Sequence, residues 1–122
     1  MKNTNPKHQA PHSTEELLYS IVSQNFSDGL LKGFTSVIEF VSGDILHVHS
    51  ISSNGNTNHY THRYFIKRVS RRRLLLGFSD QKRDLHVITV YDFDTMKVYA
   101  FIYAQRMVTT AKGTFTWKNR EN

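Results

Sequence analysis

Two runs of β-branched and aromatic residues, separated by a short polar reversal, place the strongest constraint on this fold. The first run spans Leu85–Asp92 and the second spans Lys97–Ala104. Residues of these types favour the pleated, half-buried surface of a sheet. Asp92 and Asp94 flank the reversal, where aspartate side chains accept hydrogen bonds from nearby backbone N–H groups. Since both runs are apolar on both faces, we predict a central antiparallel hairpin.

The same pattern recurs on both sides of this hairpin. Strands are predicted over 35–41, 45–52, 59–69 and 73–78, with one or two more over 107–110 and 113–118. Short strands at regular spacing, separated by turn residues, are typical of sandwiches and barrels. Closure into a barrel removes exposed strand edges. We therefore predict a mainly all-β fold, an antiparallel up-and-down barrel of seven or eight strands.

The first 30 residues divide into a tail and a predicted helix. Residues 1–12 carry two prolines and almost no apolar side chains, so we expect a disordered tail. One domain, 13–122, follows it. Residues 13–16 (STEE) have the sequence of a helix capping box. Apolar residues then follow at helical spacing, which predicts one amphipathic α-helix over about 14–27.

Composition limits the classes of function. The chain has no cysteine, which excludes disulfides, a thiol nucleophile and cysteine-based metal sites. No apolar run approaches the roughly 20 residues that span a bilayer, and the N-terminus lacks the apolar core of a signal peptide. We expect a cytoplasmic protein with no membrane partner. A homodimer formed through strand edges or through the helix is an open alternative.

A histidine pair on the predicted strand 45–52 leads to the first candidate site. His47 and His49 are two residues apart, so both side chains point to the same face. A two-residue turn at Asn54 and Gly55, or at Gly55 and Asn56, extends this face to the next strand. We predict that it lines the barrel interior and binds a small apolar or aromatic ligand. The predicted binding residues are His47, His49, Tyr60, His62, Tyr64, Ile38, Phe40 and Trp117.

Three histidines on one face are also a set that zinc or iron accepts. The carboxylate expected shortly after such a pair is missing between Ser50 and Asn54. The histidines are therefore interpreted as hydrogen-bonding groups of a cavity, or as ordinary exposed strand residues. We predict neither a metal nor another cofactor.

A basic run supports a competing hypothesis. The net charge is +6, and cationic side chains gather at Arg63, Lys67, Arg68, Arg71, Arg72 and Arg73. Lys and Arg neutralise phosphates in nucleic-acid complexes, so the alternative function is an interaction module for an acidic protein or nucleic acid. The simpler interpretation is a solvated turn whose charge protects the apolar run 74–76 from aggregation.

No catalytic motif is identifiable. Glu39, Arg63 and several tyrosines are residue types that perform acid–base chemistry. The sequence has no Ser/His/Asp order, glycine-rich phosphate loop or paired-carboxylate motif. A non-enzymatic binding protein is therefore favoured.

The span from Gly33 to Lys118 resembles small calycin-like barrels, in particular the group related to molybdenum cofactor biosynthesis protein F (the MoaF-like group). The matching residues are 38–40 (IEF), 43–44 (GD), Tyr64, 74–78 (LLLGF), 87–93 (VITVYDF), 98–102 (VYAFI) and 113–115 (GTF). The resemblance implies a lipocalin-like barrel with an internal cavity. It does not imply molybdenum chemistry, because the group's role is not a defined reaction to which residues of this chain correspond.

Overall fold

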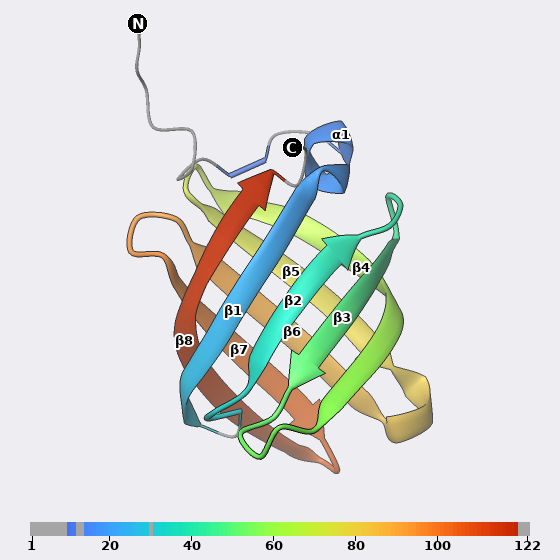
Figure 1. The fold of residues 1–122 in the computed structure, drawn as a ribbon. Coiled ribbons are helices and arrows are strands. Elements are labelled where there is room, and N and C mark those ends of the chain that lie inside the picture. Colours follow the sequence, from blue (N-terminus) through green and yellow to red (C-terminus); the bar gives the residue numbers. More distant parts are fainter. Residues whose placement is uncertain (1–9, 12–13, 30, 120–122) are drawn as a thin grey trace, which may run out of the picture.

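The computed structural model is a closed antiparallel barrel in which the strands follow one another in chain order (Figure 1). It describes residues 10–11, 14–29 and 31–119. The strands are β1 (Ser20–Gly29), β2 (Thr35–Phe40), β3 (Ile45–Ile51), β4 (Thr57–Ser70), β5 (Arg73–Asp80), β6 (Leu85–Asp92), β7 (Lys97–Ala104) and β8 (Met107–Asn119). The short helix α1 (Thr14–Leu18) precedes β1, and the 3-10 helix η2 (Gln81–Arg83) joins β5 to β6. The predicted all-β, up-and-down barrel is confirmed, with eight strands.

The central hairpin has the predicted bounds. β6 and β7 pair in register from Leu85 opposite Ala104 to Asp92 opposite Lys97. In the reversal, the backbone N–H of Asp94 donates to Oδ1 of Asp92 over 2.9 Å. The aspartates therefore act as turn residues, as the sequence predicts.

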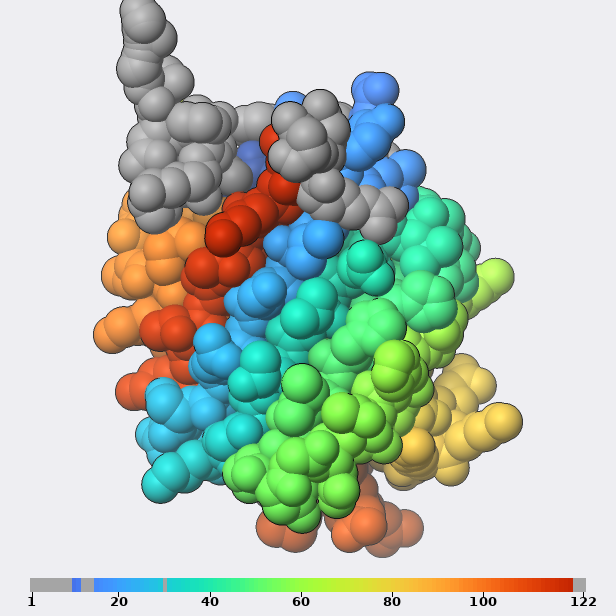
Figure 2. All heavy atoms as spheres, viewed as in Figure 1, coloured from blue at the N-terminus to red at the C-terminus, as the bar shows by residue number. Residues whose placement is uncertain are grey.

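The predicted helix over 14–27 is wrong beyond Leu18, because Ser20–Gly29 forms strand β1. This strand pairs with β2 on one side and β8 on the other, so it closes the barrel (Figure 1, Figure 2). Ser20, Val22, Gln24 and Phe26 are buried and alternate with more exposed neighbours. Pairing on two sides outweighs a helical pattern that rests on few apolar residues. Ser13 of the expected capping box lies outside the described residues. Among the helices that the structure does describe, none is long and apolar enough to cross a membrane.

The N-terminal tail is described at two positions. Ala10 is buried in the core cluster, and the carbonyl oxygen of Pro11 accepts a hydrogen bond from Nη2 of Arg68 over 2.6 Å. The remainder of the segment expected to be disordered, residues 1–9 and 12, lies outside the described residues.

Aromatic side chains fill the half of the barrel next to α1. Tyr91 packs its ring 5.0 Å from that of Phe115 and 5.3 Å from that of Trp117, centroid to centroid. Phe40 lies 5.8 Å from Trp117 and 5.2 Å from Tyr64. Leu17 of α1 belongs to the same buried cluster. This half has a packed core, and space for a ligand lies at the opposite end.

Candidate ligand-binding cavity

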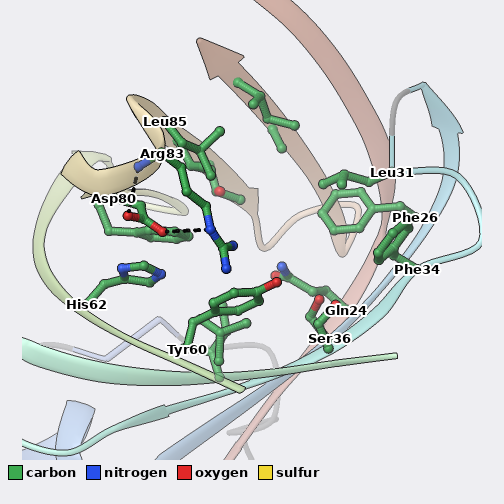
Figure 3. Close-up of a pocket in the computed structure, with 18 residues that line it drawn as sticks. Gln24, Phe26, Leu31, Phe34, Ser36, Tyr60, His62, Asp80, Arg83 and Leu85 are labelled. Atoms are coloured by element: carbon green, nitrogen blue, oxygen red, sulfur yellow. Dashed lines mark hydrogen bonds and ion pairs between the residues drawn. The ribbon is translucent and has the colours of Figure 1, made fainter. Parts of the chain in front are cut away.

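A cavity of about 240 Å³ lies at the barrel end opposite α1 (Figure 3). Its walls come from β1 to β7, from η2 and from the turn between β1 and β2. A dry cavity of about 150 Å³ accommodates benzene, whereas sites for drug-sized ligands start at about 300 Å³. The volume therefore suits a molecule built around a single ring or a short chain.

The cavity wall is mainly apolar. Figure 3 shows Phe26, Leu31 and Phe34 together on one side and Leu85 on the opposite side, and Ile102 also belongs to the lining. Alternation along each strand produces this lining, because every second residue of a closed barrel points inward. Contact of such a wall with an apolar ligand instead of water lowers the free energy of the complex.

Polar groups also line the cavity. Gln24, Ser36, Ser50 and Thr89 are buried and belong to its lining. The hydroxyl of Tyr91 donates to Oε1 of Gln24 over 2.7 Å, which fixes the orientation of the amide. Burial raises the pKa of Tyr91, so this hydroxyl keeps its proton and remains a donor.

Four side chains form a continuous stack at the mouth, which we call the rim stack: Arg83, Tyr60, His62 and Phe78. The guanidinium carbon of Arg83 lies 4.8 Å from the centroid of the Tyr60 ring. His62 is nearly parallel to both neighbours, with ring centroids 5.9 Å from Tyr60 and 4.9 Å from Phe78. Cation–π contact and ring stacking hold these side chains in one arrangement.

Asp80 anchors the stack to the backbone. Its Oδ1 accepts a hydrogen bond from the backbone N–H of Arg83 over 3.3 Å and caps η2. Its Oδ2 lies 3.5 Å from Nε of Arg83. The carboxylate therefore holds both the backbone and the side chain of Arg83, which Figure 3 shows extending over Tyr60 into the cavity.

His62 is shifted towards its neutral form. Burial lowers its pKa, Asp80 opposes this effect, and Arg83 adds to it. Near neutral pH the imidazole is therefore an uncharged ring of the stack.

A surface groove lies beside the cavity, between two strands. β4 and β5 pair from Tyr64 opposite Phe78 to Ser70 opposite Arg73, whereas the earlier part of β4 pairs with β3. A groove of about 720 Å³ lies where the two strands separate, and Tyr60, His62, Phe78 and Asp80 line both the groove and the cavity. These four side chains therefore contact both the cavity and the outer surface of the barrel.

Three of the eight predicted binding residues line the cavity: Ile38, Tyr60 and His62. Phe40, Tyr64 and Trp117 point inward but belong to the packed aromatic half. The hydroxyl of Tyr64 donates to the carbonyl oxygen of Ser42 over 2.9 Å, and burial together with Asp44 raises its pKa. These six predicted residues are therefore divided between two levels of the barrel.

His47 and His49 lie on the outer surface, so the predicted inward placement is wrong. The connection between β3 and β4 has five residues, 52–56, instead of two. His47 consequently faces Thr61, and His49 faces His59. A change of one residue in register moves a side chain to the opposite face of a sheet. The three-residue turn 42–44 also sets the register of β2 on β3. Ile38 therefore lies opposite Val48 and not on the same face as His47.

The outward histidines form a surface cluster with Glu39. His49 Nε2 lies 3.6 Å from Glu39 Oε1, and its ring lies 4.4 Å from that of His59. Nδ1 of His47 is 2.8 Å from Oγ1 of Thr61. Within the described part of the chain, no group of three or more His, Cys, Asp or Glu side chains is arranged to hold a metal ion.

The predicted basic surface is partly engaged within the molecule. Arg68 donates to Pro11 and to the carbonyl oxygen of Arg71. Arg72 Nε is 3.1 Å from Oδ1 of Asp94, and Arg73 Nε is 3.5 Å from Oδ2 of Asp92. The other three residues, Arg63, Lys67 and Arg71, are exposed.

Sequence reasoning missed Gln24, Phe78, Asp80 and Arg83. Gln24 falls within the segment predicted as a helix, and the alternate burial that turns its side chain inward appears only in the structure. Asp80 three residues before Arg83 is a capping signal. The stack itself depends on the tertiary fold, because it joins β4, β5 and η2.

Fold and site together define this chain as an eight-stranded up-and-down barrel with a cavity at one end. No family model matches the sequence, and no curated protein matches it significantly. Among solved structures, a protein from Burkholderia vietnamiensis described as a putative beta-lactamase has a similar fold, with 13% identity and a TM-score of 0.64. The match covers 81% of this chain and 92% of that one. At this identity the likeness concerns the fold alone, and the resemblance to the MoaF-like group stays a prediction.

Proposed function

We propose that this protein binds a small apolar or aromatic molecule in the cavity opposite α1, as a cytoplasmic, calycin-like and lipocalin-like binding protein. The supporting observation is a cavity of about 240 Å³ in a barrel whose other half is packed with aromatic rings. An apolar cavity lowers stability in proportion to its volume. A ligand that fills it recovers those contacts and stabilises the folded state.

Fixed polar groups would orient this ligand. Gln24 is held by Tyr91, and Tyr60 is held within the rim stack. Small-molecule sites combine apolar walls with a few placed polar groups that provide specificity. The cavity has both components on rigid strands.

Ligand-observed NMR with phenol and indole tests the proposal, using Ala100→Leu and Ala104→Leu as a matched pair. Ala100 is buried and lines the cavity, whereas Ala104 ends β7 outside the lining. We expect wild type and Ala104→Leu to bind a probe equally, and Ala100→Leu to weaken binding by about tenfold or more, which is about 1.4 kcal/mol. Circular dichroism checks that both variants fold. Absence of binding by wild type, or equal affinity in Ala100→Leu, would overturn the proposal.

The basic interaction module is the alternative proposal, and it rests on exposed Arg63, Lys67 and Arg71. Its support is weaker, because Arg68, Arg72 and Arg73 have partners within the molecule. A mobility-shift assay at low salt tests it for nucleic acid, since phosphate contacts are strongest there. Native mass measurement of the same sample tests the alternative of a homodimer.

A further inference from the structure

We propose that the ligand of this cavity is a small carboxylate with an apolar or single-ring body, and that Arg83 binds its carboxylate. This inference rests on the proposed function and specifies the ligand class. Arg83 is the only Lys or Arg among the described residues that line the cavity. Figure 3 shows its guanidinium pointing into the cavity beside the Tyr60 ring, with Gln24 and Ser36 on the opposite wall.

Most polar groups that converge on the cavity can donate hydrogen bonds. Because Oε1 of Gln24 already accepts from Tyr91, the amide nitrogen is the group of Gln24 available to a ligand. Ser36, Ser50, Thr89 and Tyr60 contribute hydroxyl groups. A carboxylate accepts several hydrogen bonds and donates none, so it complements this set.

The carboxylate of Asp80 is the exception, but it is already engaged. Its two oxygens contact the backbone N–H and the Nε of Arg83, at 3.3 Å and 3.5 Å. Contact through Nε leaves the Nη tip of the guanidinium directed away from Asp80. Two N–H groups at this tip match the geometry of a carboxylate.

Asp80 also limits how strongly Arg83 should favour an anionic ligand over a neutral one. It offsets part of the charge of Arg83, and His62 adds no positive charge because burial lowers its pKa. Arg83 is also largely exposed, so water and salt screen its field. We therefore expect a preference for the anion of about tenfold, not of several orders of magnitude.

The apolar body of the ligand would contact the mouth formed by Phe26, Leu31 and Phe34. The volume of about 240 Å³ is large enough for one aromatic ring with a short acidic side chain. Phenylacetate is a suitable probe, and phenylacetamide has nearly the same shape without the charge.

Titration calorimetry of these two probes at pH 7.5 and low salt tests the inference. Arg83→Met removes the charge and keeps an unbranched apolar stem. Lys82→Met makes the same change in charge at the neighbouring residue, which lies outside the cavity lining. We expect wild type and Lys82→Met to bind phenylacetate about tenfold more tightly than phenylacetamide. In Arg83→Met, the affinity for phenylacetate should fall to that for phenylacetamide, while the affinity for phenylacetamide should change little.

Each outcome is informative about one of the two proposals. Equal affinities in wild type, or a preference that survives in Arg83→Met, would overturn the assignment of Arg83 as the anion-binding residue. Binding of phenol or indole without binding of phenylacetate would overturn the carboxylate class and leave the proposed function intact. If none of the four probes binds, the proposed function itself fails. Arg83→Lys provides a further check, because it keeps the charge and should retain part of the preference.

Discussion

The hydroxyl of Tyr91 donates a hydrogen bond of 2.7 Å to Oε1 of Gln24, where the filled half of the barrel meets the hollow half. The Tyr91 ring packs edge-on against Phe115 and Trp117 within the aromatic core. Gln24 belongs to the cavity lining. A rigid, fully buried ring therefore sets the orientation of a polar group that faces the proposed ligand.

Removal of this hydroxyl by Tyr91→Phe should lower the free energy of unfolding by about 1–2 kcal/mol. The reason is that the buried oxygen of Gln24 loses its hydrogen-bond donor. Urea unfolding of Tyr91→Phe, Gln24→Met and the double variant measures the coupling between the two residues. We expect a coupling energy of about 1 kcal/mol, and strictly additive effects would contradict a direct contact.

Two glycines should respond differently to alanine. A Cβ on Gly113 would lie 1.8 Å from the carbonyl oxygen of Asn25 in the facing strand β1, so backbone must move. A Cβ on Gly77 would lie 2.4 Å from the ring of Phe65, an exposed side chain that can rotate away. We expect Gly113→Ala to lower the free energy of unfolding by about 1–3 kcal/mol, and Gly77→Ala to lower it by less. Thermal unfolding of both variants measures the difference, and equal costs would argue against close packing of β1 on β8.

Local pattern was sufficient to predict the hairpin β6–β7, because its residue types and its aspartate turn indicate the same structure. It was insufficient for β1. Val22 and Phe26 are four residues apart, a spacing that fits one face of a helix and also one face of a strand. The choice between them depends on β8, which lies about 90 residues further along the chain and pairs with β1 from Ser20 to Gly29.

The prediction of the candidate site depended on whether each loop has an even or an odd number of residues. An even number of residues between β3 and β4 would have placed His47 and Tyr60 on the same face, but residues 52–56 are five. The sequence SNGN permits either length, since Gly55 adopts a positive φ of 88° in a five-residue loop as readily as in a shorter turn. Arg83 could not be assigned to the site, because its position over Tyr60 arises from η2 and from Asp80.

Asp92 should contribute more to the free energy of unfolding through its turn hydrogen bond than through its charge. Its Oδ1 accepts from the backbone N–H of Asp94, and its Oδ2 lies 3.5 Å from Nε of Arg73. Asp92→Asn keeps the acceptor and should cost less than about 1 kcal/mol. Asp92→Ala removes both contacts and should cost about 1–2 kcal/mol. Chemical unfolding of both variants measures these losses, and an equal loss in Asp92→Asn and Asp92→Ala would show that the charge dominates.

Stability should decrease as the pH falls through the range in which histidine ordinarily titrates, and His62 should account for part of this decrease. Its pKa in the folded state lies below the ordinary value of 6.5, first because of burial and further because of Arg83, against the opposing effect of Asp80. Between these two pKa values the unfolded chain binds a proton that the folded chain does not, so protonation favours unfolding. Below the folded-state pKa both states bind the proton, and the dependence from this residue ends. Urea unfolding at several pH values from 5 to 8 should give a shallower slope for His62→Gln than for wild type. The loss of ring stacking on Phe78 in this variant shifts its stability by a similar amount at every pH, so the slope separates the two effects. An unchanged slope would contradict the half-buried, neutral state of His62.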